Sequence, residues 1–274
     1  MERFQRIGEQ AVMPAFVRTV PDSYIAGHLS GCPAFFFSGR GAGPILKEEC
    51  AVTTSQHLYQ AAKPIWDDCL SHPFVTGIGD GTLSVEKFQY FMLQDYLYLF
   101  DYAKVFALGV IRADRESDMR LFSTLINGTL NTENAVHKQY LKKLGVDQEG
   151  IDAAPMCLNN ESYTNYMISV AFKEGLPELA TVVLACAWSY KLIGDYMETV
   201  PGSRDESNFY KHWIETYISP AYREDTEVMI DFVDRLTEGY TEEQLQNLDR
   251  IITNCSIYEY QFWDMAWTMG KMDR

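Results

Sequence analysis

The chain has 274 residues, of which 47% are hydrophobic, so it can bury one large core or two small ones. Its formal net charge of −15 argues against a nucleic-acid partner, because binding to phosphates needs clustered Lys and Arg. No apolar run reaches the roughly 20 residues of a membrane-spanning helix, and the N-terminus lacks the apolar stretch of a signal peptide. We therefore expect a cytoplasmic protein with a small organic or cationic ligand, away from nucleic acids and membranes.

Residues 1–46 differ in composition from the rest of the chain. Four prolines interrupt any long helical period in this segment, and the run Ser-Gly-Arg-Gly-Ala-Gly adds flexible glycines. We interpret residues 1–46 as an N-terminal extension without an assigned role. Residues 47–274 are predicted to form one helical domain.

From Lys47 onward, apolar residues recur at intervals of three and four, which predicts helices. A first helix is expected from about Glu49 to Leu70. The segment 72–82 carries three glycines and a proline, which predicts a tight loop. Ser84 is well placed to cap the next helix, Val85 to about Arg112, and the aromatic residues on several sides of that helix predict a central position.

The remainder of the chain also has a helical pattern with stop signals at regular intervals. Thr241-Glu-Glu-Gln244 has the pattern of a capping box and predicts the start of a long final helix. No alternation typical of strands occurs. Before the final helix, we expect helices over about 118–144 (ended by Gly145), 161–174 (ended by Gly175), 177–200, 209–217 and 221–237. The sequence therefore predicts an all-α, single-domain helical bundle with a site between its helices.

One cysteine lies where it could react. The six cysteines form no CxxC pair, which is typical of reduced thiols. Cys186 falls in the middle of a predicted buried helix, and a cysteine there is most often an inert part of the core. Tyr190, four residues further on, lies on the same helical face, where its phenol can support a thiolate. Both interpretations remain open at this stage.

Two acidic residues are surrounded by aromatic ones. Glu259 lies within Ile257–Trp263, and burial there would raise its pKa and make it a general acid near neutral pH. The alternative is an exposed edge of an amphipathic helix. Asp95 and Tyr98 are three residues apart on one helical face, so they could converge on a polar ligand, or they could form an ordinary hydrogen bond within the core.

Glu133 and His137 have the spacing of two metal ligands on one helix. Such a pair is more often an ordinary helix-surface contact. A haem or di-iron site would also need further carboxylates and histidines at matching heights, and no other histidine lies in an ExxH unit. We therefore expect no metal ion and no organic cofactor, although a metal-dependent oxygenase that uses this pair remains an alternative.

Taken together, several motifs resemble the thiaminase II (TenA) family from about Lys47 to Met269. Their order and spacing make the match specific, although each is weak alone. The motifs are His72-Pro-Phe-Val-Thr-Gly-Ile-Gly-Asp-Gly-Thr-Leu83, Leu93-Gln-Asp-Tyr-Leu-Tyr-Leu99, Ala103-Lys-Val105, Ser162-Tyr-Thr164, Cys186 with Trp188 and Tyr190, Trp213-Ile-Glu-Thr-Tyr217, and Tyr258-Glu-Tyr-Gln-Phe-Trp263.

The resemblance implies a haem-oxygenase-like bundle that splits thiamine-derived aminopyrimidines from their leaving group. It implies that Cys186 is the nucleophile, that Glu259 lies near a pyrimidine ring nitrogen and that Asp95 holds the amino edge of the ring. A homotetramer without a cofactor is implied as well, while a non-catalytic regulatory or binding protein is the remaining alternative. The residues that line the pocket in this family match Tyr98, Tyr163, Tyr190 and Tyr217.

Overall fold

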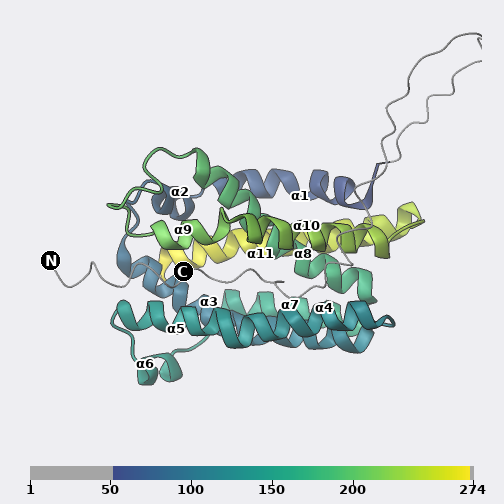
Figure 1. Ribbon diagram of the computed structural model, residues 1–274, viewed down its shortest axis with the longest axis horizontal. Coiled ribbons are helices and arrows are strands. Elements are labelled where there is room, and N and C mark those ends of the chain that lie inside the picture. Colours follow the sequence, from purple (N-terminus) through teal and green to yellow (C-terminus); the bar gives the residue numbers. More distant parts are fainter. Residues whose placement is uncertain (1–51, 272–274) are drawn as a thin grey trace, which may run out of the picture.

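The computed structural model describes residues 52–271, and every regular element in this range is a helix (Figure 1). The predicted all-α class is therefore confirmed. Residues 1–46, predicted as an extension, lie outside the described residues. The elements are α1 (Thr54–Ser71), α2 (Pro73–Gly79), α3 (Val85–Arg112), α4 (Glu116–Asn127), the π-helix η2 (Gly128–Glu133), α5 (Asn134–Lys143), α6 (Gln148–Ala153), α7 (Leu158–Lys173), α8 (Leu176–Thr199), α9 (Lys211–Tyr217), α10 (Pro220–Leu236) and α11 (Glu242–Thr268).

The long helices lie side by side along the longest dimension of the molecule in two groups. Figure 1 shows α1, α10 and α11 on one side and α3, α4, α5 and α7 on the other. Helices α8 and α11 pack against members of both groups, α8 against α10, α1, α7 and α3, and α11 against α1, α7 and α3. A site that faces α8 and α11 is therefore enclosed by side chains from much of the bundle.

The helix starts follow the local capping signals. Ser84 accepts a hydrogen bond from the backbone N–H of Lys87 at the start of α3, and the capping box of Thr241 and Gln244 opens α11, as predicted. Helix α1 starts at Thr54, later than the expected Glu49. A second capping box, formed by Thr53 with Gln56, fixes that start.

The predicted loop at residues 72–82 was wrong, because most of it forms the short helix α2. His72 caps this helix by accepting a hydrogen bond from the Phe74 N–H, and Pro73 occupies the first turn. The glycines provide room for neighbouring helices. A Cβ atom on Gly77 would lie 3.2 Å from Leu83, and one on Gly79 would lie 2.9 Å from the sulfur of Met197. Close packing therefore explains glycines that in sequence indicate a turn.

Three further boundaries differ from the sequence prediction. The helix expected over 118–144 is divided into α4, η2 and α5, because a π-helical segment interrupts it. Gly145 then ends α5 with a φ of +88°, as a C-terminal glycine does. Gly175 does not end α7 in that way. It is the N-cap residue of α8, where its backbone N–H donates to the Glu178 carboxylate. Helix α6 had no counterpart among the predicted elements.

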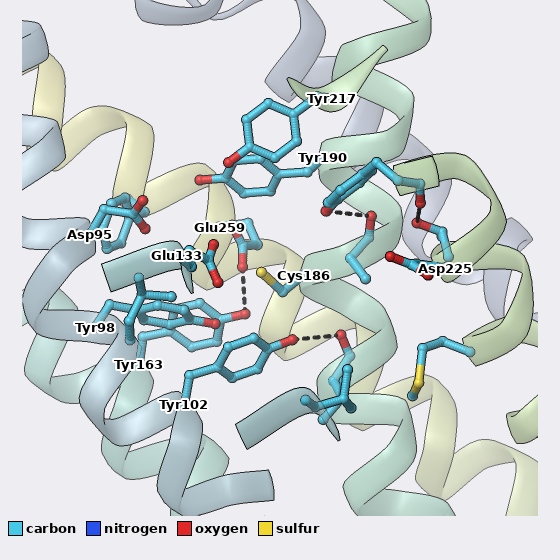
Figure 2. Close-up of a pocket in the computed structure, with 18 residues that line it drawn as sticks. Asp95, Tyr98, Tyr102, Glu133, Tyr163, Cys186, Tyr190, Tyr217, Asp225 and Glu259 are labelled. Carbon is cyan, nitrogen blue, oxygen red and sulfur yellow. Dashed lines mark hydrogen bonds between the residues drawn. The ribbon is translucent and has the colours of Figure 1, made fainter. Parts of the chain in front are cut away.

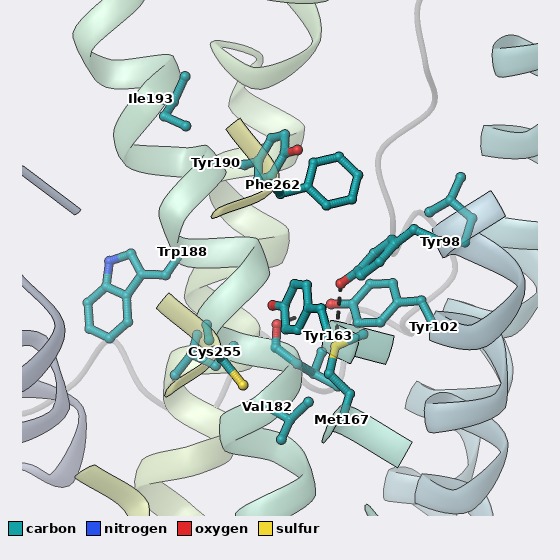
Figure 3. Packing of buried hydrophobic residues seen from close by; sticks show 14 of the residues in the cluster. Tyr98, Tyr102, Tyr163, Met167, Val182, Trp188, Tyr190, Ile193, Cys255 and Phe262 are labelled. Atoms are coloured by element: carbon teal, nitrogen blue, oxygen red, sulfur yellow. Dashed lines mark hydrogen bonds between the residues drawn. The ribbon is translucent and has the colours of Figure 1, made fainter. Parts of the chain in front are cut away.

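Helix α8 is the most enclosed of the long helices. Most of its residues from Leu179 to Ala185 have no exposed surface, and among the described residues it alone is long and apolar enough to resemble a membrane span. Most of that apolar stretch is buried within the fold, as in the core helix of a globular bundle. Figure 3 shows that Val182, Trp188, Tyr190 and Ile193 extend from α8 in different directions, and all four belong to the buried core.

Candidate active site

A cavity lies where α3, α7, α8, α10 and α11 meet, and one residue each from α4, η2 and α9 completes its lining (Figure 2). Its volume is about 60 Å³, counted as the space open to the centres of water molecules. One water needs roughly 10–15 Å³ by this measure, so the cavity has room for a few waters or for a small flat ring. The lining side chains are Asp95, Tyr98, Leu99, Tyr102, Leu125, Glu133, Tyr163, Val183, Cys186, Ala187, Tyr190, Tyr217, Tyr222, Asp225, Thr226, Met229, Glu259 and Phe262.

Cys186 faces this cavity from the middle of α8. It retains partial exposure, whereas the preceding residues of the helix are fully buried, as are the core cysteines Cys69 and Cys255. Cys186 is therefore accessible from the cavity, unlike a cysteine sealed within the core. Burial by the surrounding protein and the nearby Glu259 raise the pKa of the thiol, and a hydrogen bond with Tyr98 opposes that rise. The resting cysteine is a neutral thiol that needs a base.

Glu259 is the carboxyl group that acts most strongly on this thiol. It projects from α11 and is 3% exposed, so the alternative of an exposed helix edge is wrong. The Tyr163 hydroxyl donates a hydrogen bond of 2.7 Å to Oε1 (Figure 2). Burial raises the pKa of Glu259 to about 7, against the lowering effect of hydrogen bonds from Tyr163 and from the Cys186 thiol. A carboxyl with this pKa can both accept and donate a proton near neutral pH.

Asp95 lines the cavity from α3, and His137 of α5 contacts its carboxyl group. His137 Nε2 lies 2.7 Å from Asp95 Oδ2, and His137 Nδ1 lies 2.9 Å from the backbone oxygen of Glu133. Burial lowers the pKa of His137, but the hydrogen bond and charge of Asp95, together with Glu133, outweigh it, and the net shift is upward. The imidazole is therefore held between the Asp95 carboxyl group and the backbone oxygen of Glu133.

Glu133 points into the cavity, whereas the sequence interpretation favoured an ordinary helix-surface pair with His137 over a shared metal ion. Burial raises the pKa of Glu133 to about 7, with the charge of Asp95 adding to the rise and His137 opposing it. Within residues 52–271, no group of three or more His, Cys, Asp or Glu side chains is arranged to hold a metal ion. Glu133 thus contributes a third carboxyl to the cavity, and His137 lies behind Asp95.

All four tyrosines named from the sequence line the cavity. Tyr98 and Tyr163 approach each other with ring centroids 5.6 Å apart, and Tyr190 and Tyr217 with centroids 4.9 Å apart. The position of Tyr217 depends on Gly194 of α8, because a Cβ atom there would lie 2.4 Å from the Tyr217 carbonyl oxygen. This close approach of α9 to α8 brings the Tyr217 ring over the cavity.

Sequence reasoning missed several lining residues. Tyr102 lies one turn after Tyr98 on α3, and its hydroxyl donates to the Val183 carbonyl oxygen. The i, i+4 spacing to Tyr98 was a usable signal for it. Tyr222 and Asp225 come from α10, a helix whose sequence shows no aromatic cluster around an acidic residue. Their place in the cavity follows from the packing of α10 on α8.

Comparison with known proteins settles the relationship. The model of the TENA/THI-4/PQQC family matches residues 59–269. The chain belongs to this family. An aminopyrimidine aminohydrolase of Helicobacter pylori is 44% identical over 213 residues, which cover 78% of this chain and 98% of that protein.

Solved structures of other proteins agree with the fold. A TenA homologue from P. horikoshii OT3 matches with a TM-score of 0.74 and 27% identity, covering 80% of this chain and all of the other. A domain with a heme oxygenase-like fold from Shewanella denitrificans matches with a TM-score of 0.60 at 16% identity, covering 79% and 96%. The expected family and the haem-oxygenase-like bundle are both confirmed.

Proposed function

We propose that this chain is an aminopyrimidine aminohydrolase, a thiaminase II, which releases hydroxymethylpyrimidine for thiamine salvage. One observation carries the proposal: Cys186, Glu259 and Asp95 line a single cavity in a chain 44% identical to a protein that bears this name. The substrate class is a thiamine-derived aminopyrimidine that carries a leaving group on its exocyclic methylene carbon.

The cavity suits such a ring. An aminopyrimidine is flat and polar at its edge, so it needs an aromatic slot and acidic partners at the edge. Tyr98 and Tyr163 supply aromatic walls, and Asp95 accepts hydrogen bonds from the amino group of the ring. In the proposed complex, Glu259 faces a ring nitrogen, and Cys186 lies beside the neighbouring ring carbon.

The first step is the addition of the Cys186 thiol across a carbon–nitrogen double bond of the ring. Because burial keeps this thiol protonated, its proton must leave as the sulfur–carbon bond forms. Glu259 in its ionised form accepts that proton and passes it to the ring nitrogen that receives the electron pair. The pKa of about 7 makes both transfers accessible at neutral pH.

The remaining steps expel the substituent and restore the ring. In the adduct, electrons of the dearomatised ring push out the group on the methylene carbon, which leaves as thiazole or, from a protonated amine, as ammonia. The proton that ammonia carries away is returned by the water molecule that adds next. Water then adds to the resulting exocyclic methylene. Finally the sulfur–carbon bond breaks, the ring nitrogen returns its proton through Glu259, and hydroxymethylpyrimidine leaves. These reaction steps balance without a metal ion or an organic cofactor.

The test is the Cys186→Ser variant, assayed on the aminomethylpyrimidine and on thiamine. We expect turnover to fall about 10³-fold or more, because a serine hydroxyl is a far poorer nucleophile than a cysteine thiol. The fold and the binding of the ring should persist. Cys157→Ser is the matched control, since Cys157 is partly exposed and lies outside the cavity. Near-normal hydrolysis by Cys186→Ser would refute the cysteine mechanism, and inactivity of the wild-type chain on both substrates would refute the function.

We also propose that the protein acts in the cytoplasm as a homotetramer. The family resemblance supports the tetramer. The acidic composition and the cysteine pattern, which is typical of reduced thiols, support the cytoplasmic location. Size-exclusion chromatography with light scattering measures the assembly directly, and a monomeric mass at micromolar concentration would contradict the tetramer.

A further inference from the structure

His137 makes two hydrogen bonds that together determine where its protons lie. Its side chain is 1% exposed, and its two ring nitrogens face different acceptors. Nδ1 lies 2.9 Å from the backbone carbonyl oxygen of Glu133. A carbonyl oxygen can only accept a hydrogen bond, so Nδ1 must carry a proton.

The second contact then requires a proton as well. Nε2 lies 2.7 Å from Oδ2 of Asp95. If both were unprotonated, two lone pairs would face each other at hydrogen-bond distance in a buried site. One proton is therefore shared between the imidazole and the carboxyl group. In either position of that proton, Oδ2 is engaged by His137 and the pair carries no net charge.

The π-helix η2 explains how Glu133 serves two purposes. Its backbone oxygen holds His137, and its side chain turns into the cavity. A π-helical turn widens the helix and shifts the side chains that follow it, a feature often found at functional sites. Thr129, fully buried within η2, donates from its hydroxyl to Glu133 Oε2 at 3.4 Å. The element that orients His137 is thus tied into the same buried network.

We propose that His137 is a positioning residue that fixes Asp95 so that its oxygen Oδ1 meets the amino edge of the aminopyrimidine. This inference rests on the proposed function for the identity of the ligand. The Asp95 side chain is 12% exposed and lines the cavity, which leaves a face for the ligand. Of the three carboxyl residues Asp95, Glu133 and Glu259, Asp95 is the one with an imidazole at hydrogen-bond distance. Its Oδ2 is therefore already engaged by His137, which leaves Oδ1 as the acceptor for a ligand.

The first experiment measures the imidazole itself in the full-length chain. Nitrogen NMR with ¹⁵N-labelled histidine reports which ring nitrogen carries the proton, and His137→Gln identifies the signal of His137 among the five histidines. We expect a protonated Nδ1 with an Nε2 that is protonated or strongly hydrogen-bonded. A His137 with unprotonated Nδ1 would overturn the inference. This measurement needs no substrate, so it is independent of the proposed function.

The second experiment uses hydroxymethylpyrimidine as a binding probe, with kinetics on the aminomethylpyrimidine. His137→Leu should weaken binding and raise KM about 10- to 100-fold, the usual effect of losing one hydrogen bond to a charged group. His137→Gln keeps an N–H donor and should recover much of that loss. His212→Gln, at an exposed histidine, is the control and should change nothing.

A double-mutant cycle separates positioning from a general structural effect. If His137 acts through Asp95, His137→Leu should have little further effect on probe binding in the Asp95→Asn background. Fully additive losses would overturn the inference, as would equal binding by His137→Leu and the wild type. A wild-type chain that binds the probe but hydrolyses nothing would refute the proposed function and leave this result standing.

Discussion

Helices α3 and α11 contribute to two adjacent regions of the core with opposite properties. In the first region, which we call the aromatic cluster, Phe91 of α3 stacks on Trp263 of α11 with centroids 5.4 Å apart and planes 22° apart. One helical turn away on each helix lie Asp95 and Glu259, which both line the cavity. A shift of four residues on the same two helices thus replaces an apolar contact by an acidic, open site.

The difference separates stability from function. In the aromatic cluster, close contact between large rings supplies free energy of folding, and each ring has several neighbours. In the cavity, polar groups are buried at a cost that packing elsewhere must offset. A change in the first region should therefore affect the folded population, whereas a change in the second should affect chemistry and its pH dependence. Each prediction below tests that contrast.

The largest expected effect is in the aromatic cluster. Trp263→Ala should reduce the free energy of unfolding by about 3–5 kcal/mol, because Trp263 has no exposed surface and its removal leaves a cavity. Urea denaturation measures this loss in the free energy of unfolding. Trp267→Ala, one turn further along α11 at a ring that is 36% exposed, is the matched control and should cost less than about 1 kcal/mol. Equal losses in the two variants would contradict the contrast.

The second prediction concerns Glu259 and the pH dependence of stability. Burial raises its pKa from the ordinary 4.5 to about 7, so between these values the folded protein keeps a proton that the unfolded chain releases. The contribution of Glu259 is therefore most favourable below pH 4.5 and falls as pH rises toward 7, by about 3 kcal/mol in all. Glu259→Gln cannot ionise and should lack this slope.

The measurement for Glu259 is the difference in free energy of unfolding between variant and wild type across this pH range. As pH rises, the free energy of unfolding of Glu259→Gln should increase relative to that of the wild type. Any misfit of the amide in the folded protein adds an amount that does not depend on pH. Glu243→Gln, at an exposed glutamate on the same helix, is the control and should follow the wild type closely. A flat difference would mean that Glu259 titrates normally in the folded state.

The contrast also explains what the sequence could predict. Caps such as Ser84 and Thr241 act within one turn, so the starts of α3 and α11 follow from local pattern. Asp95 and Tyr98 share a helical face by spacing alone, which indicated a common site. By contrast, the glycines of α2 have a tertiary cause, since Leu83 and Met197 need their space, and local pattern indicated a loop.

The function of Glu133 and His137 shows the same limit within the site. Their spacing was visible in the sequence, where it favoured an ordinary helix-surface pair over two ligands of one metal ion. Their actual directions depend on the π-helix and on the packing of α5 against α3, which brings His137 to Asp95. Neither feature has a local sequence signal. The environment of Cys186 was likewise beyond prediction, because its partial exposure arises from a cavity lined by eight helical elements.

The smallest effect is expected at Tyr163, whose hydroxyl donates to Glu259. Tyr163→Phe removes a hydrogen bond that lowers the pKa of Glu259, so that pKa should rise further above 7, by about one unit for a bond worth about 1.5 kcal/mol. Because the ionised form of Glu259 accepts the Cys186 proton in the proposed reaction, kcat/KM should fall near pH 7 and recover at higher pH.

The pH profile of kcat/KM decides this last prediction, because a purely structural loss would lower the rate equally at all pH values. Tyr258→Phe is the matched control. The Tyr258 ring stacks on that of Tyr163 with centroids 5.2 Å apart, but Tyr258 does not hydrogen-bond Glu259. Removal of the Tyr258 hydroxyl should not shift the pH profile of kcat/KM. If kcat/KM of Tyr163→Phe instead rose near pH 7, with its decline at high pH moved to still higher pH, Glu259 would be acting in its protonated form, and the direction of the first proton transfer would have to be reversed.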